Sequence, residues 1–221
     1  MADTFAIIPA AGLGVRLGGE TKKQFLLLNG KMMLEHVVGR FLETKLFSKI
    51  VVCLPSDEIN DFRQKKQFSQ VTWVIGGKTR GESVRNGFKA LLAKSSDVVL
   101  IHDAARPLVS ADLIIRMVTA TQKLGAVIPV MPVSDTVKEV VKEKIIKTLD
   151  RKNLFAAQTP QGFCAQFLEK AYETFDLSKK EFTDEAMLVE ETGQTVHVIP
   201  GERTNFKVTT AFDLETAERY L

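Results

Sequence analysis

The sequence predicts an α/β fold in which helices cover both faces of a mostly parallel β-sheet. Short, nearly continuous apolar runs rich in Val and Ile are typical of the middle strands of such a sheet. Segments with helical periodicity lie between those runs, and this alternation produces right-handed βαβ units. The length of 221 residues suits one large α/β domain, so we expect a single domain over residues 1–221.

The apolar runs place the predicted strands in chain order. They cover 5–10 (FAIIPA), 49–55 (KIVVCLP), 71–76 (VTWVIG), 97–104 (DVVLIHDA), 126–133 (AVIPVMPV) and 195–200 (TVHVIP). Each run is short enough for one strand and too short to span a bilayer.

Helical periodicity alternates with these strands. It covers 32–44, 81–94 and 110–125, and further helices are expected from about Cys164, near TDEA and at the C-terminal end. Ser110 is a preferred N-cap residue, and Gly125 follows the end of the same helix. Thr210 and Asp213 have the spacing of a capping box for the last helix.

The alternating pattern breaks after Val133. Residues 134–152 contain two strand-like runs, DTVKEVV and KIIKTLD, which join around Lys142 to Lys144 and predict an inserted β-hairpin arm. The joining residues lack the Asn-Gly or Gly-Gly pair that two-residue hairpin turns prefer.

Composition excludes several classes of protein. Hydrophobic residues make up 45% and charged residues 26%, which is typical of a folded globular protein. The net charge of +3 is too small to indicate a nucleic-acid partner, and no segment indicates a membrane partner. The two cysteines lie far apart, so we expect reduced thiols and a cytoplasmic protein. Residues 1–11 lack a basic region and predict a buried strand rather than a signal peptide.

A glycine-rich stretch, IPAAGLGVRLG, follows the first predicted strand. A Walker A loop needs G-x-x-x-x-G-K-[ST], and the nearest match, TWVIGGKT, has Thr72 in place of the first Gly. A dinucleotide fingerprint needs a third small residue, and Leu17 stands there after Gly12 and Gly14. The glycines alone are therefore equally consistent with a simple tight turn.

Cations distinguish this loop from a simple turn. Arg16 lies within it, and Lys22 and Lys23 follow in KKQF. Loop amides together with Arg and Lys can surround a triphosphate and the charge that develops when its α-phosphorus is attacked. Each cation alone could be a solvated surface charge, but their combination behind a first strand favours a phosphate site.

Eight motifs in order then show a resemblance over essentially the whole chain. They are PAAGLGVRLG…KKQF, GGKTRGESVRNGF, HDAARP, DTVK, DR, QTPQ, TDEA and FKVT. Together they resemble the 2-C-methyl-D-erythritol 4-phosphate cytidylyltransferase family of the non-mevalonate isoprenoid pathway. The resemblance implies a Rossmann-like nucleotidyltransferase sheet, a homodimer formed through the hairpin arm, and transfer of CMP from CTP to the methylerythritol phosphate. It also implies a plastid stroma location if a transit peptide has been removed.

The resemblance implies three groups of site residues. The catalytic group, which stabilises the transition state, is Arg16, Lys23 and Lys207. The CTP-binding group is Ala10, Ala11, Gly12, Gly14, Gly77, Arg80, Ser83 and Asp103. The acceptor-binding group is Asp103, Arg106, Thr136, Arg151, Thr159 and Lys207, with Thr136 and Arg151 reaching in from a second subunit.

No general base or protein metal site is expected. The nucleophile is a phosphate oxygen that is already ionised, so His102 is expected to be a packed histidine. Mg²⁺ is expected to bridge the triphosphate oxygens, because the sequence has no cluster of residues with metal-ligand spacing. Lys22 stands where the family commonly has Pro, which predicts a less rigid loop.

Several alternatives remain at this stage. Arg80 and Ser83 could cap the helix that begins near Gly81 instead of binding a base. The acceptor could be ribitol 5-phosphate, although PAAG in the first loop favours the methylerythritol enzyme over that relative, which tends to have AGG there. A non-catalytic nucleotide-binding regulator could use the same sheet, although the retention of every cation argues against it.

Overall fold

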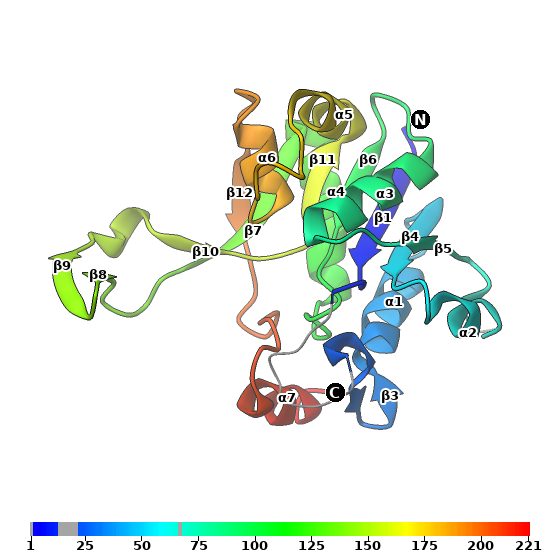
Figure 1. Ribbon diagram of the computed structural model, residues 1–221, viewed down its shortest axis with the longest axis horizontal. Coiled ribbons are helices and arrows are strands. Elements are labelled where there is room, and N and C mark those ends of the chain that lie inside the picture. The colour runs from blue at the N-terminus through cyan, green and yellow to red at the C-terminus, as the bar shows by residue number, and fades with distance from the viewer. Residues whose placement is uncertain (1, 13–21, 66–67) are drawn as a thin grey trace.

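A computed structural model describes residues 2–12, 22–65 and 68–221. The chain folds around one large sheet with strand order β10-β7-β11-β6-β1-β4-β5, and β12 also pairs with β7 (Figure 1). The strands of this sheet are β1 (Thr4–Pro9), β4 (Lys49–Leu54), β5 (Val71–Ile75), β6 (Val98–Ile101), β7 (Ala126–Pro132), β10 (Phe155–Ala157), β11 (Gln161–Cys164) and β12 (His197–Pro200). The predicted α/β class is confirmed.

The sheet is mostly parallel, as the sequence predicts. Pairings among β1, β4, β5 and β6 are parallel, as is that of β12 with β7. Two strands that the sequence analysis missed, β10 and β11, run antiparallel, and β11 lies between β6 and β7. Gly162 in β11 allows helix α4 to pack closely, because an added Cβ would lie 2.0 Å from Thr121 Oγ1.

Helices cover both faces of the sheet. Successive residues of a strand point to opposite faces, so each strand contributes to two hydrophobic cores. Ala6 and Ile8 of β1 belong to a core with α1 (Met33–Thr44), α2 (Ile59–Arg63) and α4 (Ala111–Leu124). Phe5 and Ile7 belong to the opposite core with α3 (Arg80–Leu91), α5 (Ala165–Thr174) and α6 (Glu185–Glu190). The α2 helix was not predicted.

The remaining elements lie outside the main sheet. Two short strands, β2 (Leu27–Leu28) and β3 (Lys31–Met32), pair near the last helix, α7 (Ala211–Glu218). The predicted caps are confirmed: Ser110 accepts a hydrogen bond from Leu113 N–H, and Thr210 forms a capping box with Asp213. None of the helices in the described ranges is both long and apolar enough to cross a bilayer.

The predicted hairpin forms an arm that projects from the body of the molecule (Figure 1). It consists of β8 (Lys138–Val141) and β9 (Lys144–Thr148), followed by a 3-10 turn at Arg151–Asn153. Lys142 and Glu143 have φ of 47° and 66°, so the two-residue turn takes left-handed conformations without the usual glycine. Every residue of the two strands is exposed.

The strand order fixes where a ligand can bind. From β1 the chain moves outward through β4 and β5, then returns to place β6 on the other side of β1. This reversal creates a topological switch point between β1 and β6. Open α/β sheets bind ligands at such a point, beyond the carboxyl ends of the strands.

Candidate active site

A cleft of about 440 Å³ lies at this switch point. It is bounded by the segments that follow β1, β5 and β6 and by the segment containing Lys207. The structure places nine predicted site residues along it: Ala10, Ala11, Gly12, Lys23, Gly77, Arg80, Ser83, Asp103 and Lys207. Gly14 and Arg16, also predicted, lie outside the described residues.

Ser83 shapes one wall of the cleft. Its buried hydroxyl accepts a hydrogen bond from Gly77 N–H at 3.0 Å and donates one to Thr79 O at 2.9 Å. An added Cβ at Gly76 would lie 2.2 Å from Ala11 Cβ, so glycine is required where these loops meet. The N-cap of α3 is Thr79, in a capping box with Glu82. The alternative that Ser83 caps this helix is therefore wrong.

Gln24 holds the residues that directly follow β1 and was missed by the sequence analysis. Its buried side chain donates to Ala10 O at 2.7 Å and to Gly12 O at 3.1 Å. It adjoins Lys23 in the 3-10 turn Lys23–Phe25, so these bonds fix the base of the segment that presents Lys23 to the cleft.

Lys22, the first described residue after the glycine-rich stretch, forms two ion pairs. Its ammonium pairs with Asp57 at 2.9 Å and Glu58 at 3.3 Å, and the hydrogen bond to Asp57 raises the pKa of Lys22. Two ion pairs thus connect this chain segment to the residues before α2. The predicted lower rigidity concerns the loop of residues 13–21, which lies outside the described residues, so it stays a prediction.

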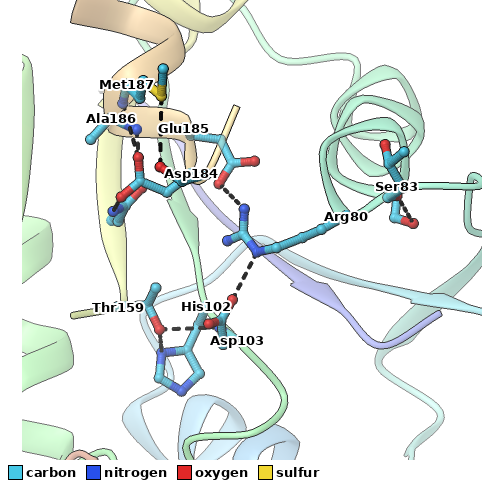
Figure 2. A network of polar contacts seen from close by, with 12 residues as sticks. Arg80, Ser83, His102, Asp103, Thr159, Asp184, Glu185, Ala186 and Met187 are labelled. Atoms are coloured by element: carbon cyan, nitrogen blue, oxygen red, sulfur yellow. Dashed lines mark hydrogen bonds and ion pairs between the residues drawn. The ribbon is translucent and has the colours of Figure 1, made fainter. Parts of the chain in front are cut away.

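Four charged side chains of alternating sign are linked in a row that runs from the cleft into the protein interior. Asp103 Oδ1 accepts from Arg80 Nε at 2.9 Å, and Asp103 Oδ2 pairs with Lys207 Nζ at 2.8 Å. Arg80 Nη1 pairs in turn with Glu185 Oε2 at 2.7 Å. Figure 2 shows Arg80 extending from α3 between the two carboxylates.

Burial and ion pairing together set the pKa values of Asp103, Glu185 and Arg80. Burial would raise the pKa of Asp103, but the charges of Arg80 and Lys207 outweigh it and hold that pKa well below its ordinary value. Burial raises the pKa of Glu185, against the opposing charge of Arg80. Burial opposes the charge on Arg80, yet Glu185 and Asp103 together raise its pKa. Asp103 and Arg80 are therefore charged at neutral pH.

A second cavity of about 140 Å³ adjoins the cleft, and the two share the side chains of Arg80, Asp103 and Lys207. Arg106 and Thr159, both predicted to bind the acceptor, line it. Arg106 is held by hydrogen bonds from Nη1 to Asn205 O at 2.8 Å and from Nη2 to Ala157 O at 3.3 Å. Burial lowers the pKa of Arg106.

His102 is a packed histidine, as predicted. It is fully buried, and its Nε2 donates to Arg106 O at 3.1 Å. Thr159 Oγ1 accepts from Asp103 N–H at 3.1 Å and donates to His102 Nδ1 at 3.0 Å (Figure 2). Burial lowers the pKa of His102 to about 4, so the ring is neutral at physiological pH.

Two predicted acceptor residues lie elsewhere. Thr136 and Arg151 are exposed, belong to the arm and line neither cavity. The guanidinium of Arg151 donates to the carbonyl of Ser134 within the arm. Within one chain the arm thus does not complete the site.

The side chains that line the cleft indicate how a metal cation could be held there. The described residues contain no group of three or more His, Cys, Asp or Glu side chains placed to bind a metal. Asp103 is the one acidic side chain among the described residues that line the cleft, and both of its oxygens are paired. These residues fit a divalent cation that is held mainly by a phosphate ligand and water.

The arrangement of the two cavities suits two anionic ligands that bind side by side. Each cavity presents backbone groups and cationic side chains, and Lys207 lies where the cavities meet. Such a junction can screen the repulsion between two phosphates and stabilise charge that develops between them.

Comparisons with known proteins agree with this geometry. A family model described as IspD: 2-C-methyl-D-erythritol 4-phosphate cytidylyltransferase matches residues 4–221. The enzyme of that name from Syntrophus aciditrophicus is 37% identical over 222 residues, which span 98% of this chain and 94% of that protein. The one from Rhodococcus jostii is 43% identical over 214 residues, or 96% and 92% of the two chains.

A solved structure is similar throughout. The crystal structure of the 2-C-methyl-D-erythritol 4-phosphate cytidylyltransferase (IspD) of Francisella tularensis has a TM-score of 0.86 and 35% sequence identity to this chain, and the similarity covers 100% of both.

Proposed function

The chain belongs to the IspD family of 2-C-methyl-D-erythritol 4-phosphate cytidylyltransferases, and from that premise we propose how its residues carry out the reaction. The enzyme transfers CMP from CTP to 2-C-methyl-D-erythritol 4-phosphate in isoprenoid precursor biosynthesis. The products are 4-diphosphocytidyl-2-C-methyl-D-erythritol and pyrophosphate. The family thus excludes the alternative of a non-catalytic regulator and favours the methylerythritol acceptor over ribitol 5-phosphate.

One observation carries the proposed mechanism: the larger and the smaller cavity meet at Asp103 and Lys207. We assign CTP to the larger cavity and the acceptor to the smaller one. An oxygen of the acceptor phosphate then attacks the α-phosphorus of CTP at the junction. The bond from that phosphorus to the β-phosphate oxygen breaks, and pyrophosphate leaves on the opposite side.

Lys23 and Lys207 supply the charge that this displacement needs. Both line the larger cavity, and Lys207 also lines the smaller one. Asp103 orients the ammonium of Lys207 through the 2.8 Å ion pair, so the cation is positioned before the reaction begins. Arg16 is proposed to join them on the strength of the family resemblance alone, because it lies outside the described residues.

The hydrogen bonds of Ser83 support recognition of cytosine. Its hydroxyl proton is directed to Thr79 O, and one lone pair accepts from Gly77 N–H. The remaining lone pair can accept from the exocyclic amine of cytosine, whereas uracil presents a carbonyl at that position and has no proton to donate. Ala10, Ala11 and Gly12 complete this part of the proposed CTP site with backbone groups.

Arg106 and Thr159 are proposed to bind the acceptor in the smaller cavity. Mg²⁺ is the proposed divalent cation. It would be held by triphosphate oxygens and water beside Asp103, and when bound it would neutralise part of the triphosphate charge.

We propose that the arm makes the enzyme a homodimer. Val140, Val141, Ile145 and Ile146 are each more than half exposed, at 54%, 52%, 64% and 58%. An isolated two-stranded hairpin is marginally stable in water, so these apolar side chains need a surface to cover them. A second subunit would supply it, and its Thr136 and Arg151 would reach the acceptor. We also propose a cytoplasmic location, because the two cysteines are free.

Paired assays test this function. The chain is incubated with CTP, Mg²⁺ and either 2-C-methyl-D-erythritol 4-phosphate or ribitol 5-phosphate, and pyrophosphate and the nucleotide product are measured. We expect turnover with the first acceptor and at least about a hundredfold less with the second. UTP in place of CTP should also be a poor substrate. Equal turnover of both acceptors, or none with either, would contradict the assigned acceptor.

A further inference from the structure

Glu185 is a buried carboxylate that the proposed mechanism does not use. Its side chain is 2% exposed, and it lines neither cavity, so it does not touch a substrate bound in either of them. Burying a carboxylate is costly unless it is well paired, and its partner here is Arg80. The placement of this charge behind the site therefore calls for an explanation.

The backbone around Glu185 is held firmly in place. Glu185 is the first residue of α6, and the Asp184 side chain caps that helix by accepting from Met187 N–H at 2.9 Å. Gln161 of β11 donates to Asp184 at 2.7 Å and accepts from Ala186 N–H at 3.1 Å, which attaches the start of α6 to the sheet. The Glu185 carboxylate thus occupies a defined position.

Two carboxylates bind the guanidinium of Arg80. Its Nε donates to Asp103, and its Nη1 donates to Glu185 (Figure 2). A guanidinium that faces one carboxylate tends to bind both of its oxygens in a bidentate pair. Asp103 does not allow this, because its second oxygen pairs with Lys207. The group that could take that second oxygen together with Nε is Nη2, since Nη1 lies on the far side of the guanidinium. The ion pair of Nη1 with Glu185 fixes the orientation of the whole guanidinium, with Nε on Asp103 Oδ1 and with Oδ2 left to Lys207.

We propose that Glu185 is a positioning residue of the transfer reaction: it holds Arg80 in a monodentate pair with Asp103 and thereby keeps Lys207 at the junction of the two cavities. This inference rests on the proposed role of Lys207. Without the Glu185 charge, Arg80 would take both oxygens of Asp103 and Lys207 would lose its anchor.

Glu185→Gln tests this directly, because glutamine keeps the shape of the side chain and removes its charge. We expect kcat to fall about tenfold as Lys207 becomes misplaced, with KM for CTP changed less than about twofold. Glu190→Gln is the matched control, since it removes an exposed charge from the same helix and should leave kcat unchanged. An unchanged kcat in folded Glu185→Gln would overturn the proposal.

A double-mutant cycle with Arg80→Gln shows whether Glu185 acts through Arg80. If it does, Arg80→Gln with Glu185→Gln should have nearly the same kcat as Arg80→Gln alone, because Glu185 then has nothing to hold. The double variant should also melt at a higher temperature than Arg80→Gln, which leaves Glu185 buried without a counter-charge. If the fold-losses in kcat of the two single variants multiply in the double variant, Glu185 acts independently of Arg80, which contradicts the proposal.

Two further variants keep the test decisive. If Glu185→Gln does not fold, Glu185→Asp keeps the charge but withdraws it by one methylene, and kcat should again fall; wild-type kcat would overturn the proposal. Lys207→Ala tests the underlying role separately. An active Lys207→Ala refutes the proposed site, whereas an inactive Lys207→Ala beside a fully active Glu185→Gln refutes the positioning role alone.

Discussion

Arg80 and Arg151 show how differently two arginines of one chain can be held. The Arg80 side chain is 28% exposed and lies between two carboxylates anchored on separate elements. Arg151 is exposed on the arm, where its guanidinium donates to a backbone carbonyl of the same arm. The first is positioned by its own chain before any ligand binds. The second has a defined role only if something outside the chain meets it.

The surroundings of the two arginines differ in the same way. Near Arg80, polar side chains are buried and paired, as in the contacts of Asp103, Thr159 and His102. On the arm, apolar side chains such as Ile145 and Ile146 are exposed. We therefore assign the proposed chemistry to the preorganised charge in the body of the molecule, and the proposed assembly to the uncovered apolar surface of the arm.

Removing Lys207 should have the largest effect, because it deletes a cation from the preorganised region. Lys207→Ala should lower kcat by about a hundredfold or more, since the removed group stabilises developing charge. The side chain is 44% exposed, so the melting temperature should change little. Lys170→Ala, an exposed lysine on α5, serves as the control in steady-state kinetics. A kcat within about threefold of wild type would remove Lys207 from the mechanism.

Disrupting the apolar surface of the arm should affect assembly rather than folding of the body. Ile145→Asp should shift the protein towards monomer in sedimentation experiments and lower kcat/KM for the acceptor about tenfold. Ile115→Asp is the control, because Ile115 is 48% exposed but lies on α4. A variant that stays dimeric and fully active would show that the arm is not the interface.

The buried region should show a pH dependence of stability that comes from His102. The pKa of His102 is about 4 in the fold and 6.5 ordinarily, so the unfolded chain binds the extra proton first as pH falls. The stability contributed by the neutral ring is complete above pH 6.5 and is lost between pH 6.5 and 4. His102→Gln should therefore have a melting temperature that varies less than that of wild type between pH 7 and 5. An equal pH slope in both proteins would contradict neutral burial of the ring.

The turn of the arm should give the smallest effect. Replacing Lys142 with Asn and Glu143 with Gly supplies residues that tolerate the observed positive φ values. The arm should be stabilised by about 0.5–1 kcal/mol, seen as slower amide exchange in β8 and β9. Exchange in β1 should stay the same and provides the internal control. Faster exchange in the arm would mean that the turn does not have this conformation.

The sequence predicted the parallel strands and the main helices because their apolar periodicity is strong. It did not predict β10 and β11, which have three and four residues and no clear period. Gly162 in β11 is informative only once α4 is seen packed against it. Short strands of this kind are determined by their neighbours rather than by their own composition.

The cleft residues could be predicted because they lie in glycine-rich or charged motifs at the ends of strands. Gln24 and Glu185 could not, because a polar residue in a sequence normally indicates a solvated surface. Both are buried here and bonded to other segments of the chain: Gln24 bonds to carbonyls 12 and 14 positions away, and Glu185 pairs with Arg80 across 105 positions. The motifs KKQF and TDEA contained the signal, but only the fold shows what these side chains hold.

The proposed division between a preorganised body and an arm that serves the partner is tested most directly by mixing two inactive variants. Lys23→Ala removes a cation that is proposed to act in the site of its own chain. Arg151→Ala removes a cation of the arm that is proposed to act in the site of the partner. Refolded together in equal amounts, they should form mixed dimers in which one site carries both defects and the other carries neither. Random pairing should then restore about a quarter of all sites, and activity should recover in proportion. Activity that stays at the level of the separate variants, with mixed dimers confirmed by mass, would contradict a site shared between subunits.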